Sequence, residues 1–250
     1  MFILLSNDDG VNSEGLHSLK KVLSKSNEVW VVAPDSERTC VAHAITVHTP
    51  LRIHDLGDHV FSTNGTPADS VLLALKIIIP RKPDIVISGI NKGPNMGQDV
   101  SYSGTVAAAK EGALAGAVSM AVSLNARKDF LFDDASRSVV DIVDIVRSHP
   151  LPSSTFLNIN IPNIPYEERR GFMVTGLGKR IYNGIIIERK DPRGGAYYWI
   201  GGNSDGFEAI AGTDLYAVDQ GYLSVTPLHW DLTSYASLEK LQGIFQVRKS

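Results

Sequence analysis

The chain has 250 residues, of which 43% are hydrophobic and 20% charged, so its composition is globular and excludes disordered and collagen-like classes. The formal net charge of −3 argues against binding of a nucleic-acid duplex, because affinity for a polyanion requires an excess of Lys and Arg. The single cysteine, Cys40, excludes an intrachain disulfide and a thiolate metal cluster, which fits a reducing compartment.

The N-terminal apolar run is short. Residues 2–5 are apolar, but Asp8 follows almost at once, so the run is too short for a signal-peptide core or a membrane span. We therefore expect a cytoplasmic protein without a membrane partner.

The first half of the chain predicts alternating strands and helices. Apolar runs without polar alternation, which are typical of strands buried on both faces, occupy residues 2–6, 29–33 and 84–88. Helical patterns occupy residues 14–23, 69–78 and 106–117. This alternation predicts a doubly wound α/β fold with a mostly parallel sheet and helices on both faces.

The second half changes in character. Residues 125–137 are polar and are predicted to form a loop, followed by a helix over 138–147 and a strand over 156–161. The chain beyond Gly171 is β-rich, and glycine pairs mark its turns. Its predicted strands are 180–188, 196–200 and 221–226, and the glycine pairs are 194–195 and 201–202.

These patterns predict one domain over residues 1–250. An α/β core occupies about 1–125, and a β-rich extension with a hairpin occupies about 170–235. The extension is expected to return to the core through the strand 223–226.

Oxygen-bearing side chains follow three of the predicted strands. Asp8 and Asp9 follow the first, Thr39 lies beyond the second, and Asn91 follows the third. Ligands of open α/β sheets bind at the carboxyl ends of strands, and adjacent carboxylates with neutral oxygens suit a hard cation such as Mg²⁺ or Mn²⁺. We therefore predict a divalent-metal site, with a helix cap at Asp8 and a turn at Asp9 as the alternative.

A second candidate site precedes the Ala-rich helix. Ser103, Gly104 and Thr105 place hydroxyl groups and free backbone amides at a helix start, an arrangement that binds phosphate. An ordinary helix cap is the alternative.

Other polar residues have structural explanations. We expect His43 and Cys40 to pack in the structure, and Thr66 to cap a helix that begins near Pro67. His229 and Asp231 follow the last strand, where they suit either proton transfer or, for Asp231, the capping of a terminal helix.

Six motifs, in order and spanning nearly the whole chain, resemble the SurE family of survival proteins. They are Ile3–Val11 (ILLSNDDGV), Val31–Asp35 (VVAPD), Gly65–Asp69 (GTPAD), Ser88–Gly97 (SGINKGPNMG), Tyr102–Ala109 (YSGTVAAA) and Gly221–Leu228 (GYLSVTPL). The resemblance implies a Rossmann-like core and a 5′-nucleotidase, a phosphatase of nucleoside 5′-monophosphates. It also implies a homodimer or homotetramer in which the C-terminal segments are exchanged between subunits.

The resemblance also implies roles for single residues. It assigns one divalent ion per subunit to Asp8, Asp9, position 39 and Asn91, and phosphate to the Ser103–Thr105 turn. Asn95, in the fourth motif, is expected to contact the substrate. The family usually has Ser followed by Gly where this chain has Thr39 and Cys40, so Thr39 keeps the hydroxyl oxygen while Cys40 loses the backbone freedom of glycine.

We expect a metal-activated water to attack the phosphorus without a covalent intermediate, with Asp8 or Asp9 orienting or deprotonating the water and Asn91 holding the ion. One alternative is an aspartyl-phosphate phosphatase, which needs an acid two residues beyond its nucleophile. Others are a Mg²⁺-binding receiver domain for signalling and a nucleotide-binding module without catalysis.

Overall fold

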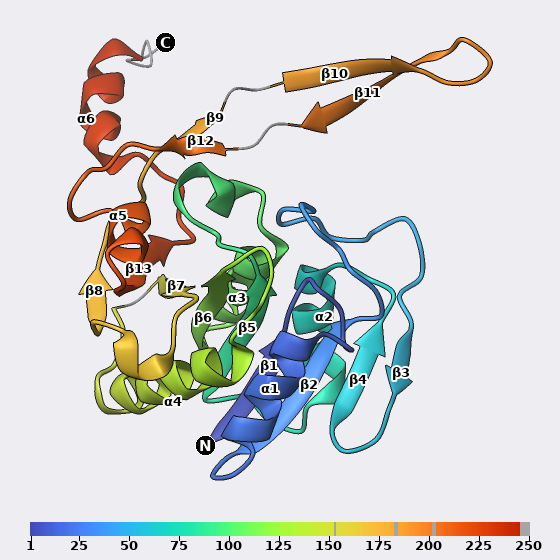
Figure 1. Ribbon diagram of the computed structural model, residues 1–250. Coiled ribbons are helices and arrows are strands. Elements are labelled where there is room, and N and C mark those ends of the chain that lie inside the picture. The colour runs from blue at the N-terminus through green and yellow to red at the C-terminus, as the bar shows by residue number, and fades with distance from the viewer. Residues whose placement is uncertain (153, 183–184, 202–203, 246–250) are drawn as a thin grey trace, which may run out of the picture.

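The computed structural model describes residues 1–152, 154–182, 185–201 and 204–245. Its central sheet has nine strands in the order β3-β4-β2-β1-β5-β6-β7-β13-β8 (Figure 1). The strands of this sheet are β1 (Phe2–Ser6), β2 (Glu28–Pro34), β3 (Ile53–Asp55), β4 (Val60–Thr63), β5 (Ile85–Lys92), β6 (Val118–Asn125), β7 (Thr155–Pro162), β8 (Phe172–Val174) and β13 (Leu223–His229). The six strands from β4 to β7 in this order are mutually parallel, whereas β3 and β13 run antiparallel to β4 and β7. The predicted α/β fold with a mostly parallel sheet is confirmed.

Helices cover both faces of the sheet. They are α1 (Glu14–Leu23), α2 (Pro67–Leu73), α3 (Gly104–Leu114) and α4 (Phe132–Ser148). Successive side chains of β1 enter different cores, because side chains alternate along a strand. Ile3 and Leu5 pack with residues of α1 and α4, and Leu4 packs with residues of α2 and α3. Burial on both faces explains the unbroken apolar runs of the central strands.

Strand order reverses between β1 and β5. From β1 the chain builds β2 and β4 on one side, and β5, β6 and β7 follow on the other. This is the topological switch point at which open α/β sheets bind ligands. The acid pair after β1 therefore lies beside the end of β5, where Asn91 and Lys92 are the last strand residues and the 93–97 segment leaves the sheet.

Several predicted boundaries were wrong. Helix α4 begins at Phe132, inside the predicted 125–137 loop, because the polar Asp133 and Asp134 belong to its first turn while Phe132 and Ala135 are buried. Strand β6 was not predicted, since it follows the Ala-rich helix α3 after a short turn. Helix α3 instead ends at Leu114, and Gly116 (φ +76°) turns the chain into β6. Strands β3 and β4 were also missed.

The C-terminal extension contains the predicted hairpin. Its elements are β9 (Arg180–Tyr182), β10 (Ile185–Lys190), β11 (Ala196–Gly201), β12 (Ser204–Phe207), α5 (Asp214–Asp219) and α6 (Tyr235–Ile244). Strands β10 and β11 pair antiparallel around a turn that includes Gly194, and in Figure 1 they extend away from the sheet. Parts of the predicted 180–188 strand and of the 201–202 turn lie outside the described residues. The expected return to the core is confirmed, because β13 pairs with β7; the boundaries of core and extension stay a prediction.

Among the described residues, no helix combines the length and apolar character needed to cross a membrane. The cytoplasmic location stays a prediction.

Gly89 in β5 allows close contact between β5 and β6. Its φ is +142°, and a Cβ atom there would lie 2.3 Å from the carbonyl oxygen of Val122. We therefore expect Gly89→Ala to lower the free energy of unfolding by about 3 kcal/mol, measured by urea denaturation. Gly176→Ala is the control, because an added methyl group there meets nothing within 4 Å. Equal midpoints for both variants would contradict the expected clash.

Candidate active site

A tight turn carries the acid pair away from β1. Gly10 has φ +95°, and the buried Asn7 fixes the turn by donating from Nδ2 to the Gly10 carbonyl (3.0 Å) and to Ser13 Oγ (2.6 Å). The chain has thus left strand geometry at this point, so Asp8 and Asp9 do not have to point to opposite faces of the sheet.

Asp8 lies against the start of α3. Its side chain is almost completely buried, and Oδ1 accepts a 2.6 Å hydrogen bond from Thr105 Oγ1. The pKa of Asp8 is raised to about 6, because burial and the neighbouring charge of Asp9 raise it more than the hydrogen bond from Thr105 lowers it. The metal and phosphate candidates, separate in the sequence, are therefore in direct contact.

Asp9 is joined to the end of β5. Its Oδ2 accepts a 3.0 Å hydrogen bond from the backbone N–H of Lys92. Burial raises the pKa of Asp9, the bond and charge of Lys92 lower it, and Glu37 raises it. The two carboxylates thus connect β1 with α3 and with β5.

The start of α3 is a capped helix N-terminus. Ser103 Oγ accepts a hydrogen bond from the Val106 N–H at 3.1 Å, which confirms the cap, and its own hydroxyl proton remains available for a ligand oxygen. A Cβ atom on Gly104 would lie 2.9 Å from Asp8 Cβ, so the helix approaches Asp8 this closely because position 104 is glycine.

Asn91 and Asn95 occupy different environments. Asn91 is half-buried, and its Nδ2 donates to the Gly93 carbonyl at 2.8 Å, which leaves Oδ1 available to a cation. Asn95 is buried, and its Nδ2 donates to Ser123 Oγ at 2.8 Å. Its expected contact with substrate stays a prediction.

Thr39 and Cys40 lie on an exposed loop. Thr39 Oγ1 donates to Glu37 Oε1 at 2.5 Å rather than to the acid pair. The expectation that Cys40 packs in the interior was wrong: the thiol is exposed, and φ is +57°. A left-handed backbone is unfavourable for a residue with a Cβ atom, so the residue is held there by its loop.

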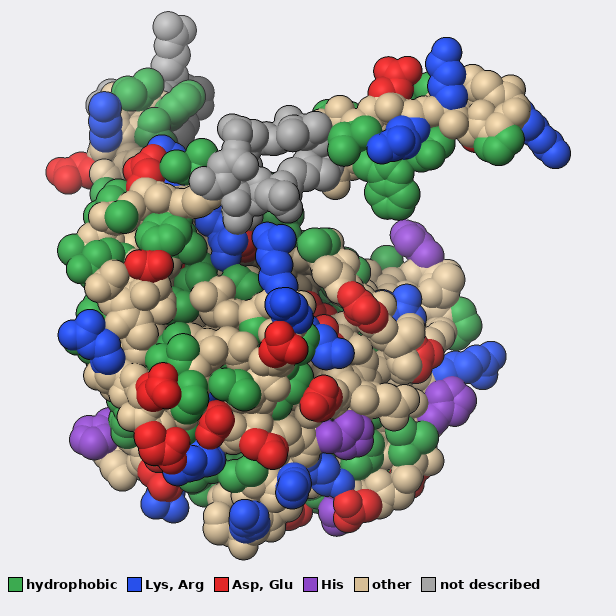
Figure 2. Space-filling model, in the orientation of Figure 1, with side chains coloured by type: hydrophobic (Ala, Val, Ile, Leu, Met, Phe, Trp, Pro, Cys, Tyr) green, Lys and Arg blue, Asp and Glu red, His purple; other side chains and the backbone are tan. Residues whose placement is uncertain are grey.

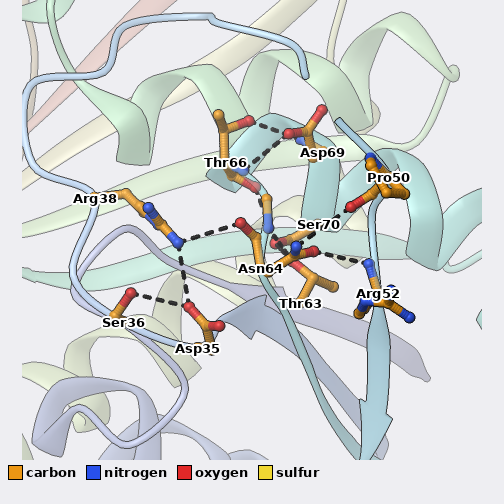
Figure 3. Close-up of polar contacts among 11 residues, drawn as sticks. Asp35, Ser36, Arg38, Pro50, Arg52, Thr63, Asn64, Thr66, Asp69 and Ser70 are labelled. Atoms are coloured by element: carbon orange, nitrogen blue, oxygen red, sulfur yellow. Dashed lines mark hydrogen bonds and ion pairs between the residues drawn. The ribbon is translucent and has the colours of Figure 1, made fainter. Parts of the chain in front are cut away.

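Arg38, which the sequence reasoning missed, positions this loop. Its backbone N–H donates to the Asp8 carbonyl at 2.7 Å. Its guanidinium donates to Asp35 Oδ1 (3.3 Å) and to the carbonyl of Asn64 (3.2 Å), as Figure 3 shows. An arginine within the polar segment that follows β2 was the available sequence signal.

The other predicted polar residues have structural partners. Thr66 and Asp69 form a reciprocal capping box with Pro67 at the first turn of α2, as expected (Figure 3). His43 Nε2 lies 3.0 Å from Glu111 Oε2 on α3, a structural contact.

Asp231 contacts the start of the terminal helix α6. It accepts hydrogen bonds from Tyr235 Oη (2.5 Å) and from the Thr233 N–H, and these bonds lower its pKa to about 2. Such a carboxyl is a poor proton donor near neutral pH, which argues against proton transfer with His229. The expected capping was also wrong, because the N-cap residue of α6 is Ser234, no side chain caps the helix, and Asp231 bonds to the N–H of Thr233, which precedes the helix.

The donor set at the acid pair fits a hard cation. Nowhere in the described ranges do three or more His, Cys, Asp or Glu side chains gather as a metal site, so an ion here depends on two carboxylates and neutral oxygens. Oxygen donors of this kind suit Mg²⁺ or Mn²⁺. Asn7 Oδ1, one residue before the pair, is buried without a protein partner. Both the paired carboxylates and this unpaired oxygen would gain from a positive charge.

Comparisons with known proteins show the family of the chain. Residues 3–184 match the family described as Survival protein SurE. Two bacterial proteins named 5′-nucleotidase SurE, from Geotalea daltonii and Citrifermentans bemidjiense, are 46% and 48% identical over 243 and 244 residues, and each alignment covers 97% of this chain and 98% of the relative. The crystal structure of the SurE protein from Aquifex aeolicus gives a TM-score of 0.88 at 43% identity and covers 97% of this chain and 98% of that one. The chain therefore belongs to the SurE family.

Proposed function

We propose that this chain is a 5′-nucleotidase that hydrolyses nucleoside 5′-monophosphates to nucleoside and phosphate with a divalent cation. The observation that carries the proposal is the contact between Asp8 and Thr105, because it places an acid pair against an anion-binding helix start. Membership of the SurE family and the name 5′-nucleotidase of its relatives support the same activity.

Asp8, Asp9 and Asn91 would hold one Mg²⁺ or Mn²⁺ ion per subunit, with Thr39 as a fourth ligand once its hydroxyl leaves Glu37. When bound, such an ion polarises phosphate oxygens and lowers the pKa of water.

The chain's own groups supply orientation and proton transfer. The Ser103 hydroxyl and the backbone amide of Gly104 would hold the phosphate oxygens together with Thr105, whose backbone amide also bonds to Asp8, and Asn95 contributes to substrate binding. Asp8 or Asp9 orients the attacking water or accepts its proton. The new P–O bond forms as the bond to the nucleoside 5′-oxygen breaks, and that oxygen takes up a proton from the carboxyl or from solvent, so no phosphoryl-enzyme forms.

The geometry argues against an aspartyl-phosphate enzyme. That chemistry requires a second acid two residues beyond the nucleophile, and here that position is Gly10. A receiver domain needs an acceptor aspartate at a later strand end, where this chain has Asn91. The phosphate-release assay described below distinguishes the proposed enzyme from a module that binds nucleotides without hydrolysing them.

Assembly with further copies of the chain is also proposed. Hydrophobic side chains gather on the hairpin of β10 and β11, which stands clear of the body (Figure 2). Ile200 is 94% exposed and Trp199 61%. An apolar surface of this kind is typical of an interface, so we propose a homodimer or homotetramer with exchanged C-terminal segments.

Asp8→Asn should abolish metal-dependent phosphate release from a panel of nucleoside 5′-monophosphates, with kcat/KM at least 10³-fold lower, because a neutral amide neither holds a cation as well nor accepts a proton. Circular dichroism should be unchanged. Asp144→Asn, an exposed acid on α4, is the control and should keep full activity. Retained activity in Asp8→Asn would contradict the assignment, and an inactive wild type would contradict the nucleotidase.

The same substitution should stabilise the metal-free protein. The pKa of Asp8 is about 6 in the folded state and 3.8 in the unfolded chain, so the folded state binds more protons between these values, and stability falls as pH rises through this window. With chelator at pH 8, Asp8→Asn should unfold at higher urea by an amount equivalent to roughly 3 kcal/mol. The difference in unfolding free energy between the two proteins should disappear near pH 4. A wild type as stable as Asp8→Asn at pH 8 would be inconsistent with a buried charge at Asp8.

Ile200→Lys should shift the protein toward the monomer in sedimentation velocity, because a charge would have to be buried in the interface. Asp144→Lys adds a positive charge at an exposed position on α4, outside the hairpin, and should leave the assembly intact. An unchanged sedimentation coefficient for Ile200→Lys would show that the hairpin is not the interface.

A further inference from the structure

Two asparagines of β7 hold the segment that follows β5. Asn160 Oδ1 accepts the N–H of Asn95 at 2.8 Å, and Asn160 Nδ2 donates to the carbonyl of Asn95 at 3.0 Å. Asn158 Nδ2 donates to that same carbonyl at 2.8 Å. Asn158 and Asn160 are fully buried. We name this pair the asparagine clamp.

The chemistry of the clamp requires amide side chains. Asn160 satisfies both backbone groups of residue 95, as a neighbouring strand would, and only an amide offers a donor and an acceptor in this arrangement. Asn158 and Asn160 reach the same segment because side chains two residues apart lie on one face of a strand. Buried backbone groups left unpaired would be costly, so the three bonds fix the position of Asn95.

The clamped segment contacts the candidate metal ligands directly. The carbonyl of Gly93 accepts from Asn91 Nδ2 at 2.8 Å and thereby orients the Asn91 amide. The N–H of Lys92 donates to Asp9 Oδ2 at 3.0 Å. A displacement of residues 92–95 would therefore move both Asn91 Oδ1 and the Asp9 carboxylate.

We infer that Asn158 and Asn160 are positioning residues of the active site, which act through the backbone of residues 92–95 on Asn91 and Asp9. The expected effect on catalysis rests on the proposed function. The expected effect on the position of residues 92–95 rests only on the hydrogen bonds.

Asn160→Leu tests the clamp, since it removes two of the three bonds at nearly constant volume. We expect kcat for nucleoside monophosphate hydrolysis to fall on the order of 10²-fold with KM changed less than threefold, because misplaced ligands impair the chemical step more than phosphate binding. Titration with Mn²⁺ alone should show an affinity weaker by roughly 10-fold or more. Hydrogen exchange of the Asn95 N–H should become faster.

Asn158→Leu, which removes one bond, keeps the test decisive if Asn160→Leu does not fold, and it should give smaller effects in the same direction. Ser224→Ala is the control, because Ser224 pairs in register with Asn160 and its buried Oγ has no partner. A folded clamp variant with wild-type kcat, Mn²⁺ affinity and Asn95 exchange would overturn the inference. If the wild type releases no phosphate, the proposed function fails, and Mn²⁺ affinity and exchange still decide the clamp.

Discussion

The burial of two adjacent carboxylates at the switch point of the sheet is the constraint on which the rest of this structure depends. Burial raises the pKa of both Asp8 and Asp9, so the metal-free protein holds this pair at a free-energy cost at neutral pH. Apolar packing elsewhere must supply that free energy, and the two cores on either face of the sheet do so. A site that is unfavourable when empty is one that gains most when a cation binds.

The elements around the pair are arranged to hold it in place. Glycine at position 104 permits α3 to approach Asp8, and the turn at Gly10 is fixed by Asn7. The backbone of Arg38 bonds to Asp8 and that of Lys92 to Asp9. Each of these restraints comes from a different segment of the chain. The geometry of the site therefore depends on the order of strands in the sheet, which brings these segments together, and not on the acid motif alone.

Much of this arrangement could be predicted from the sequence, and the reasons are local. The bounds of β1 and α1 were predicted correctly. A strand that is buried on both faces gives an unbroken apolar run, and a helix that is buried on one face gives apolar residues at helical spacing. Strand β6 was not predicted. Its Ala and Ser residues are buried by the neighbouring strands β5 and β7, and the sequence alone does not show which strands will be neighbours. The clamp was equally hidden: Asn158 and Asn160 read as the polar face of an alternating strand, and their common partner is more than 60 residues away in the chain.

The loop with Thr39 and Cys40 is the part of the candidate site where the structure differs from the arrangement that the family resemblance implies. Among the residues that resemblance assigns to the metal, Asp8, Asp9 and Asn91 are fixed by contacts that already exist, whereas Thr39 is exposed and bonded to Glu37. The next residue has the left-handed backbone that suits the glycine usual in the family, yet here it is Cys40. A side chain in that conformation costs about 1 kcal/mol, which the loop must offset through bonds such as that from Ala42 N–H to the Tyr102 carbonyl. In this structure the carboxylates of Asp8 and Asp9 are therefore held in place by the protein, whereas the Thr39 hydroxyl would have to leave Glu37 to reach an ion.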